Sequence, residues 1–206
     1  NHRYHTYDYF AVDPLLGVAV AVKDNMDMRG LVTTNASTVG VPPPAAADAE
    51  VVARLRAAGA DLFCKTNLLE YAAGSVNPTY GMTLNPLHRG RTSGGSSSGS
   101  AALVGAGVCH HATGTDTGGS IRIPAAYCGI VGLKPTYGLV PVTGVFELSP
   151  TLDHVGPLAR TVRGAAELLS VLSGAPCPVE PVSGVRVGVL VRHLDEPQLR
   201  PGVRDR

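Results

Sequence analysis

The order of hydrophobic and polar residues predicts strands that alternate with helices in the first third of the chain. Residues 15–23 are apolar on both faces of the backbone and rich in valine, which is typical of a strand buried in a sheet. Residues 49–58 place apolar side chains at helical spacing, with Asp48 as the N-cap and Gly59 as the terminator. Residues 61–65 then predict a second, short strand.

The same alternation continues toward the C-terminus. A run of small residues over 100–106 predicts a buried helix. Another helix is predicted from its cap at Thr161 through Leu172, with Gly174 ending it, and residues 185–191 predict a further strand. Strands that alternate with helices indicate an α/β fold around a mixed, largely parallel central sheet flanked by helices.

Composition limits the classes of protein to consider. The 206 residues are 44% hydrophobic, enough for one sizeable core, and no apolar run is long enough to span a membrane. A formal net charge of +1 argues against nucleic acid or an anionic membrane as the partner, because both attract clustered basic residues. The four cysteines are widely spaced, which favours reduced thiols and a cytoplasmic setting. The adjacent His110 and His111 would point to opposite faces of a strand, so no metal site is expected.

Two serines in glycine-rich turns are the first candidates for chemistry. Ser96 lies within residues 94–100, and Ser120 ends the turn over residues 114–120. In the second turn, successive backbone N–H groups can converge on one point because glycine avoids a Cβ clash, as an oxyanion hole requires. The first turn also has the composition of a flexible linker, but it leads directly into an apolar segment that must be buried. No histidine is placed as the base of a catalytic triad, so a different base is needed.

Lys23 is the candidate base. It ends the apolar strand, and burial disfavours the ammonium form, so a lysine there can be neutral near pH 7 and accept a proton from a serine hydroxyl. The alternative is structural, with the side chain reaching from the strand end to pair with Asp24 or Asp27. Position alone favours this structural alternative.

Taken together, these segments resemble the amidase signature family. Residues 94–102 (GGSSSGSAA) are similar to the family's GGSSGGSAA, with Ser98 in place of a glycine. Residues 116–135 (DTGGSIRIPAAYCGIVGLKP) look like the family's core motif almost letter for letter, and residues 17–25 resemble its lysine strand. The resemblance covers most of residues 15–190 and implies the amidase-signature fold.

The resemblance also implies a Ser-cisSer-Lys amide hydrolase that needs no cofactor. Ser120 would be the acyl-enzyme nucleophile, and Ser96, after a cis peptide bond, would relay its proton to neutral Lys23. The expected oxyanion-hole donors are the backbone N–H groups of Thr117, Gly118, Gly119 and Ser120. The expected supporting residues are Asp116, Arg122 and Ser97, and the positions that line the acyl pocket in relatives correspond to Ala73, Gly74 and Ser75.

The resemblance leaves three functional alternatives. Residues 138–146 and 151–157 look most like amidases that act on small amides, including those associated with nitrile degradation, which makes a small-molecule amide the expected substrate. The nearest rival is the glutamine amidotransferase subunit that modifies mischarged tRNA together with its partner subunits. The third alternative is a non-catalytic fragment or half-protein that needs a partner chain.

The family's catalytic domain is longer than this chain. Residues 1–206 are therefore interpreted as the N-terminal portion of a single amidase signature domain, with the core motif at 91–137 and the C-terminal half absent. A helix that begins near Pro201 would be interrupted where the sequence ends, so the fold is expected to be truncated there. Because such a portion would expose a sheet edge and apolar surface, the expected partner is a second copy, as a homo-oligomer, or a complementing C-terminal half.

Overall fold

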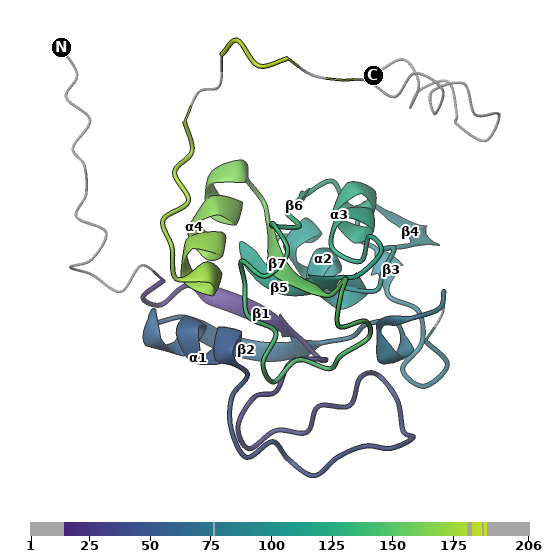
Figure 1. The fold of residues 1–206 in the computed structure, drawn as a ribbon. Coiled ribbons are helices and arrows are strands. Elements are labelled where there is room, and N and C mark those ends of the chain that lie inside the picture. The colour runs from purple at the N-terminus through teal and green to yellow at the C-terminus, as the bar shows by residue number, and fades with distance from the viewer. Residues whose placement is uncertain (1–14, 76, 181–182, 187, 189–206) are drawn as a thin grey trace.

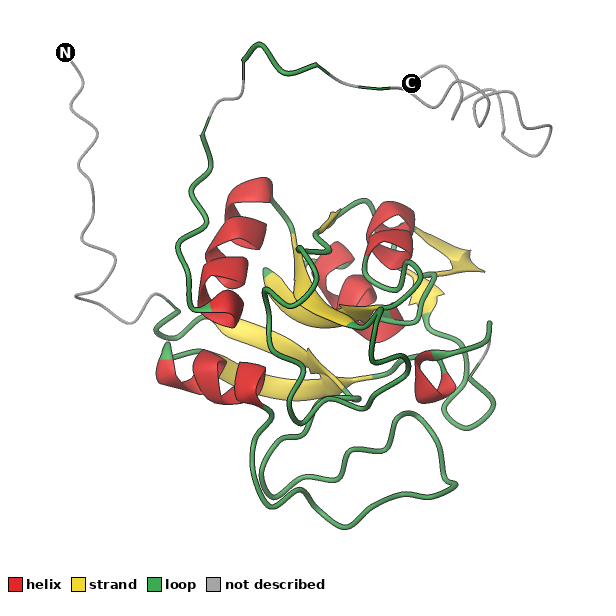
Figure 2. Ribbon diagram, in the orientation of Figure 1, coloured by secondary structure: helices red, strands yellow, loops and turns green. Residues whose placement is uncertain are grey.

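A five-stranded mixed sheet lies between two layers of helices in the computed structural model, which describes residues 15–75, 77–180, 183–186 and 188 (Figure 1, Figure 2). The sheet order is β2-β1-β5-β7-β6. Its strands are β1 (Ala19–Lys23), β2 (Asp61–Thr66), β5 (His111–Asp116), β6 (Val131–Gly132) and β7 (His154–Ala159). A separate two-stranded sheet pairs β3 (Leu84–Asn85) with β4 (His88–Thr92), and a short 3₁₀ helix covers Glu70–Ala72.

The strand pairing brings two important chain positions to one edge of the sheet. β2, β1 and β5 run parallel, β7 is antiparallel to β5, and β6 is antiparallel to β7, which confirms a mixed sheet. Lys23 ends β1 and Asp116 ends β5, its parallel neighbour. In open α/β sheets, ligand sites form at the carboxyl ends of such strands.

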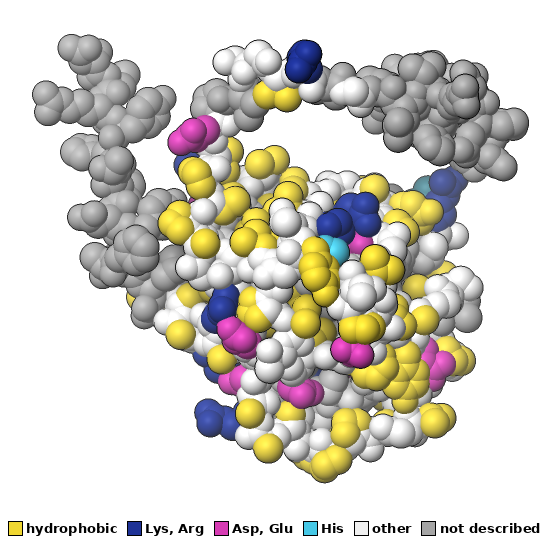
Figure 3. Space-filling model, in the orientation of Figure 1, with side chains coloured by type: hydrophobic (Ala, Val, Ile, Leu, Met, Phe, Trp, Pro, Cys, Tyr) yellow, Lys and Arg dark blue, Asp and Glu magenta, His cyan; other side chains and the backbone are white. Residues whose placement is uncertain are grey.

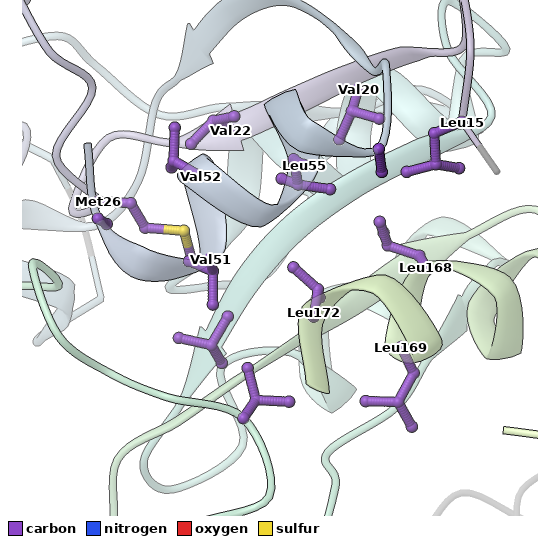
Figure 4. Close-up of a cluster of buried hydrophobic side chains, with 14 of the residues drawn as sticks. Leu15, Val20, Val22, Met26, Val51, Val52, Leu55, Leu168, Leu169 and Leu172 are labelled. Atoms are coloured by element: carbon purple, nitrogen blue, oxygen red, sulfur yellow. The ribbon is translucent and has the colours of Figure 1, made fainter. Parts of the chain in front are cut away.

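The helices cover the two faces of the sheet in pairs. α1 (Glu50–Ala57) and α4 (Val162–Ser173) pack on one face, and α2 (Ser98–Gly105) and α3 (Arg122–Cys128) pack on the other (Figure 1). β1 alternates accordingly: Val20 and Val22 enter the core with α1 and α4, and Ala21 enters the core with α2 and α3. Figure 4 shows the first of these cores, where valines of β1 and α1 face leucines of α4.

The predicted α4 is confirmed with its capping residues. The Thr161 hydroxyl accepts a hydrogen bond from the Gly164 amide at 3.0 Å, and Gly174 ends the helix in the left-handed conformation with φ 71°. The helix expected over 100–106 forms as Ser98–Gly105. Ser97 is its N-cap, and the buried Ser98 and Gly99 begin its first turn.

The predicted N-cap of α1 is wrong. Ala49 occupies the cap without a side-chain hydrogen bond. The Asp48 carboxylate instead accepts hydrogen bonds from the Arg29 backbone amide at 2.7 Å and from Arg56 Nε at 3.0 Å. Both of its oxygens are therefore bonded to groups other than the first amides of α1.

Two sequence expectations fall partly or wholly outside the described residues. The strand predicted over 185–191 lies mostly outside the described residues, and the described positions Val185, Arg186 and Gly188 have no regular secondary structure. The helix start near Pro201 lies outside the described residues altogether. The four cysteines are free, and within the described part of the chain no helix is long and apolar enough to cross a membrane.

Candidate active site

Lys23 is fully buried at the end of β1, and its amine contacts two hydroxyl groups. Nζ donates to Ser96 Oγ at 2.8 Å and to Thr115 Oγ1 at 2.7 Å. The structural alternative for this lysine, an ion pair with Asp24 or Asp27, is wrong. Asp24 pairs with Lys65 Nζ at 2.5 Å, and the Asp27 carboxylate accepts from the Thr33 hydroxyl at 2.6 Å. Two side chains from β5 and from the turn before α2 therefore enclose the amine.

Burial determines the charge state of this amine. It lowers the pKa of Lys23 from 10.5 to about 7, and the negative charges of Asp116 and Asp153 oppose that fall only in part. A substantial fraction of the amine is thus neutral near neutral pH. A neutral amine has a free lone pair and can accept the proton of the serine hydroxyl that it contacts.

The turn that carries Ser96 depends on glycine at two positions. Gly94 adopts φ 79°, and a side chain at Gly95 would come within 2.6 Å of Leu69. The Gly95–Ser96 peptide bond is cis, as the family resemblance implied. Ser96 itself is 1% exposed, so the linker interpretation of this glycine- and serine-rich run is wrong. α2 begins two residues later and packs against β1 and β5.

Asp116 anchors the loop that contains Ser120. Its buried carboxylate accepts two hydrogen bonds from the Arg122 guanidinium, each at 3.0 Å, and a third from the Ile121 amide at 3.1 Å. Burial alone would raise the pKa of this carboxyl, but the hydrogen bonds from Arg122 and the backbone outweigh it and hold the pKa below its ordinary value. Asp116 is therefore charged, and it fixes the end of the loop beyond Ser120.

The loop of residues 117–120 presents backbone amides and the Ser120 hydroxyl. The amides of residues 117–120 donate none of the turn and loop hydrogen bonds found among the described residues. Gly119 adopts φ 141°, and a side chain there would come within 2.7 Å of Ile123. Ser120 is partly buried, and its carbonyl accepts from the Ser97 amide at 3.2 Å. Among the described residues, no hydrogen bond involves the Ser120 hydroxyl.

Hydrogen bonds join some of the predicted site residues, and others lie apart from the site. A side-chain hydrogen bond joins Lys23 to Ser96, and a backbone hydrogen bond joins Ser97 to the Ser120 segment. The Ser97 hydroxyl also accepts from the Thr115 amide and donates to the Thr115 carbonyl, both at 3.2 Å, which ties the two turns to each other. Ala73, Gly74 and Ser75 are exposed and do not line the adjacent cavity, although Ala72 does.

A cavity of about 70 Å³ adjoins the site. Its polar lining includes Asn25, Thr115, Thr117, Asp153 and His154, and the loop of residues 142–150 forms much of its apolar wall. Sequence reasoning missed Asn25 and Thr115, which together with Lys23 form a buried hydrogen-bonded group: Asn25 Nδ2 donates to Thr115 Oγ1 at 3.0 Å. The available signal was adjacency, because these residues flank Lys23-Asp24 and Asp116 along the sequence.

Comparisons with known proteins point to one family. The family model described as Amidase matches residues 2–182. The chain is 47% identical over 193 residues to the A subunit of glutamyl-tRNA(Gln) amidotransferase from Methanospirillum hungatei, covering 85% of this chain and 44% of that protein. It is 47% identical over 211 residues to the corresponding protein of Symbiobacterium thermophilum, covering 94% and 43%.

Solved structures of amidases superpose on this chain as well. A crystal structure described as an amidase superposes with a TM-score of 0.78 at 46% identity, covering 82% of this chain and 39% of the other. The peptide amidase from Stenotrophomonas maltophilia superposes with a TM-score of 0.74 at 40% identity, covering 79% and 35%. The chain therefore spans less than half the length of the relatives that it matches.

Proposed function

Because the chain belongs to the amidase family, we propose that it carries the catalytic residues of an amide hydrolase that converts a carboxylic amide to an acid plus ammonia or an amine. The observation that carries the proposal is the buried Lys23 amine, with its pKa lowered to about 7, at 2.8 Å from the Ser96 hydroxyl. A charged lysine in this position could only donate, whereas a neutral one can serve as a general base.

The proposed first half of the reaction forms an acyl-enzyme. Ser120 Oγ attacks the amide carbonyl carbon while its proton passes to Ser96, and the Ser96 proton passes to the lone pair of Lys23 Nζ. When the tetrahedral intermediate collapses, the carbon–nitrogen bond breaks, and the proton returns from Lys23 through Ser96 to the leaving nitrogen. The relay ends this half-reaction with Lys23 neutral again.

The second half uses water in place of Ser120. Water attacks the acyl carbon, and its proton follows the same relay to Lys23. The carbon–oxygen bond to Ser120 breaks, and the relayed proton returns to Ser120 Oγ. In both halves the backbone amides of residues 117–120 would hold the oxyanion, and the loss of one such donor typically raises the barrier by about 3 kcal/mol. This scheme requires no metal or cofactor.

The nature of the amide is a further part of the proposal. The cavity beside Thr115 and Thr117 is small, which fits a small-molecule amide or the end of a larger one. The curated relatives described above favour a second candidate, a glutamine amidase that works as one component of an amidotransferase. The two candidates share the same proposed relay and differ in the acyl group.

The surface around the site suggests that a partner completes it. Tyr137, Val142, Phe146, Leu148 and Leu152 are all more than a third exposed in the segment that borders the cavity. Figure 3 shows hydrophobic side chains spread over the viewed face among charged ones. A complementing C-terminal polypeptide or a second copy of the chain would cover such surface. If the chain is a half-protein that is inactive by itself, the third alternative, then activity should appear only with that partner.

A fluorophosphonate reagent tests the proposed nucleophile directly. The reagent forms a covalent bond to a serine that is activated and lies beside oxyanion donors. We expect mass spectrometry of the purified chain to locate the adduct on Ser120, and the Ser120→Ala variant to carry no adduct. Absence of an adduct on the wild-type chain both alone and together with a complementing C-terminal polypeptide would refute the proposed function.

The acyl group is identified by a second experiment. The chain is mixed with glutamine or with a short aliphatic amide and quenched in acid, and the mass of the acyl-enzyme is measured by mass spectrometry. A mass increase at Ser120 with the aliphatic amide supports the small-amide amidase. An increase with glutamine alone supports the amidotransferase-type candidate.

A further inference from the structure

The Asp153 carboxylate connects two loops that border the candidate active site. Its Oδ1 accepts a hydrogen bond from the Thr117 hydroxyl at 2.5 Å. Its Oδ2 accepts from the backbone amides of Leu148 and Ser149, at 2.8 and 2.9 Å. Both carboxylate oxygens are thus used, and hydrogen bonds to a charged acceptor are stronger than neutral ones.

The two connected loops have separate places in the site. Thr117 is the first residue of the loop that ends at Ser120, and its amide is one of the four proposed oxyanion donors. Leu148 lies in the wall of the adjacent cavity. Asp153 itself lines that cavity, so its carboxylate lies between the cavity wall and the proposed nucleophile loop.

The sheet provides a rigid base for this connection. Asp153 immediately precedes β7, and the first residue of β7, His154, pairs with Asp116, the last residue of β5. The loop of residues 117–120 is therefore held at both ends. Asp116 binds the Arg122 guanidinium and the Ile121 amide at the far end, and Asp153 binds Thr117 at the near end.

We propose that Asp153 is a positioning residue for the nucleophile loop: its carboxylate fixes Thr117, and with it the oxyanion donors, relative to β7 and the cavity wall. This inference rests on the proposed function. A donor displaced from the developing oxyanion loses much of its effect, because catalysis of this kind depends on preorganised geometry.

The charge of Asp153 has a second consequence that provides a test. Asp116 at the end of β5 and Asp153 before β7 are the two charged groups that raise the pKa of Lys23 against the effect of burial. Asp116 is paired with Arg122, and Asp24, the neighbour of Lys23, is paired with Lys65 of β2. Neutralising Asp153 therefore lowers the pKa of Lys23 further, and the pH at which half of Lys23 is neutral moves to lower values.

The experiment measures how fast a fluorophosphonate labels Ser120 across the neutral pH range. The variants are Asp153→Asn, Thr117→Val, their double combination and Thr117→Ser, which keeps the hydroxyl. Asp61→Asn is the matched control. Asp61 is an exposed carboxylate that begins β2, whereas Thr66, the residue that pairs with Lys23, lies at the other end of the same strand. Each rate is divided by the folded fraction from circular dichroism, so that loss of fold is not counted as loss of positioning.

We expect Asp153→Asn to label roughly 10- to 100-fold more slowly, which is the effect of losing a hydrogen bond to a charged group at a site sensitive to geometry. The midpoint of its pH profile should move to lower pH, and Thr117→Val should be slowed without that movement. The double variant should be no slower than the slower single variant, because both substitutions remove the same bond. Thr117→Ser, which keeps the hydroxyl, should recover most of the rate lost in Thr117→Val, and Asp61→Asn should label like the wild type.

Equal labelling of Asp153→Asn and wild type, or losses that multiply in the double variant, would overturn the inference. Should Asp153→Asn fail to fold, Thr117→Val alone decides, since unchanged labelling in that variant excludes a positioning role. These outcomes differ from failure of the proposed function, in which the wild-type chain is not labelled at Ser120 at all.

Discussion

Replacement of Lys23 by methionine should separate the stability of the fold from its proposed chemistry. The lysine amine is fully buried, and its pKa falls from 10.5 to about 7 on folding. Between these two values the unfolded chain binds a proton that the folded chain does not. Wild-type stability therefore rises with pH across this window, and below it the full cost of burying the amine is present.

The magnitude follows from the two pKa values. Each pH unit in the window changes the free energy of unfolding by about 1.4 kcal/mol, so the whole window corresponds to roughly 5 kcal/mol. Lys23→Met has no group that titrates there, and its advantage over the wild type should be largest near pH 7 and shrink as pH rises. The net stability advantage of Lys23→Met is smaller than the value for the whole window, because Ser96 and Thr115 each lose a hydrogen bond worth about 1 kcal/mol.

The assay is urea unfolding of both proteins at a series of pH values above neutrality. The quantity of interest is the slope of the stability difference against pH, which the lost hydrogen bonds do not alter. Lys65→Met is the control: its amine pairs with Asp24, so this substitution should destabilise the chain at neutral pH. Parallel stability curves for the wild type and Lys23→Met would refute the reasoning, because they would mean that folding does not perturb the amine.

Three other substitutions test the local structure around the site. Gly119→Ala should cost roughly 1–3 kcal/mol and slow the labelling of Ser120, because φ 141° strains any side chain; adding Ile123→Ala should relieve the 2.7 Å contact but not restore the rate. The pKa of His111 is lowered chiefly by burial, so stability should fall as pH drops below about 6.5, and urea unfolding of His111→Gln should lack that acid sensitivity. Thr161→Ala should lower the free energy of unfolding by about 1 kcal/mol, since the Gly164 amide loses its cap, while Thr161→Ser should not.

Local signals in the sequence were sufficient for much of the fold. Thr161 and Gly174 predicted both ends of α4, because a cap and a left-handed terminator act on their immediate neighbours. The valine-rich run before Lys23 predicted a buried strand for the same reason. Asp48 failed as a predicted cap because Arg29 and Arg56 supply its hydrogen-bond partners, and a pattern along one segment carries no information on such partners.

The site depended on contacts between distant parts of the chain. The apolar strand predicted that Lys23 is buried, but its partner Thr115 lies on another strand, and no spacing rule connects the two. Asp153 contacts Thr117 for the same topological reason, since β5 and β7 are neighbours in the sheet. The exposed Ala73 shows the opposite case, in which a correspondence with relatives alone did not place a residue at the cavity.

The central claim, that neutral Lys23 activates Ser120 through Ser96, is tested most directly by the pH dependence of Ser120 labelling in the wild type and in Lys23→Ala. We expect a wild-type rate that rises with a midpoint near pH 7, where the lysine loses its proton. In Lys23→Ala the rate should be strongly reduced near neutrality and rise continuously toward high pH, as hydroxide replaces the missing base. The same midpoint and the same rate in Lys23→Ala would contradict the account.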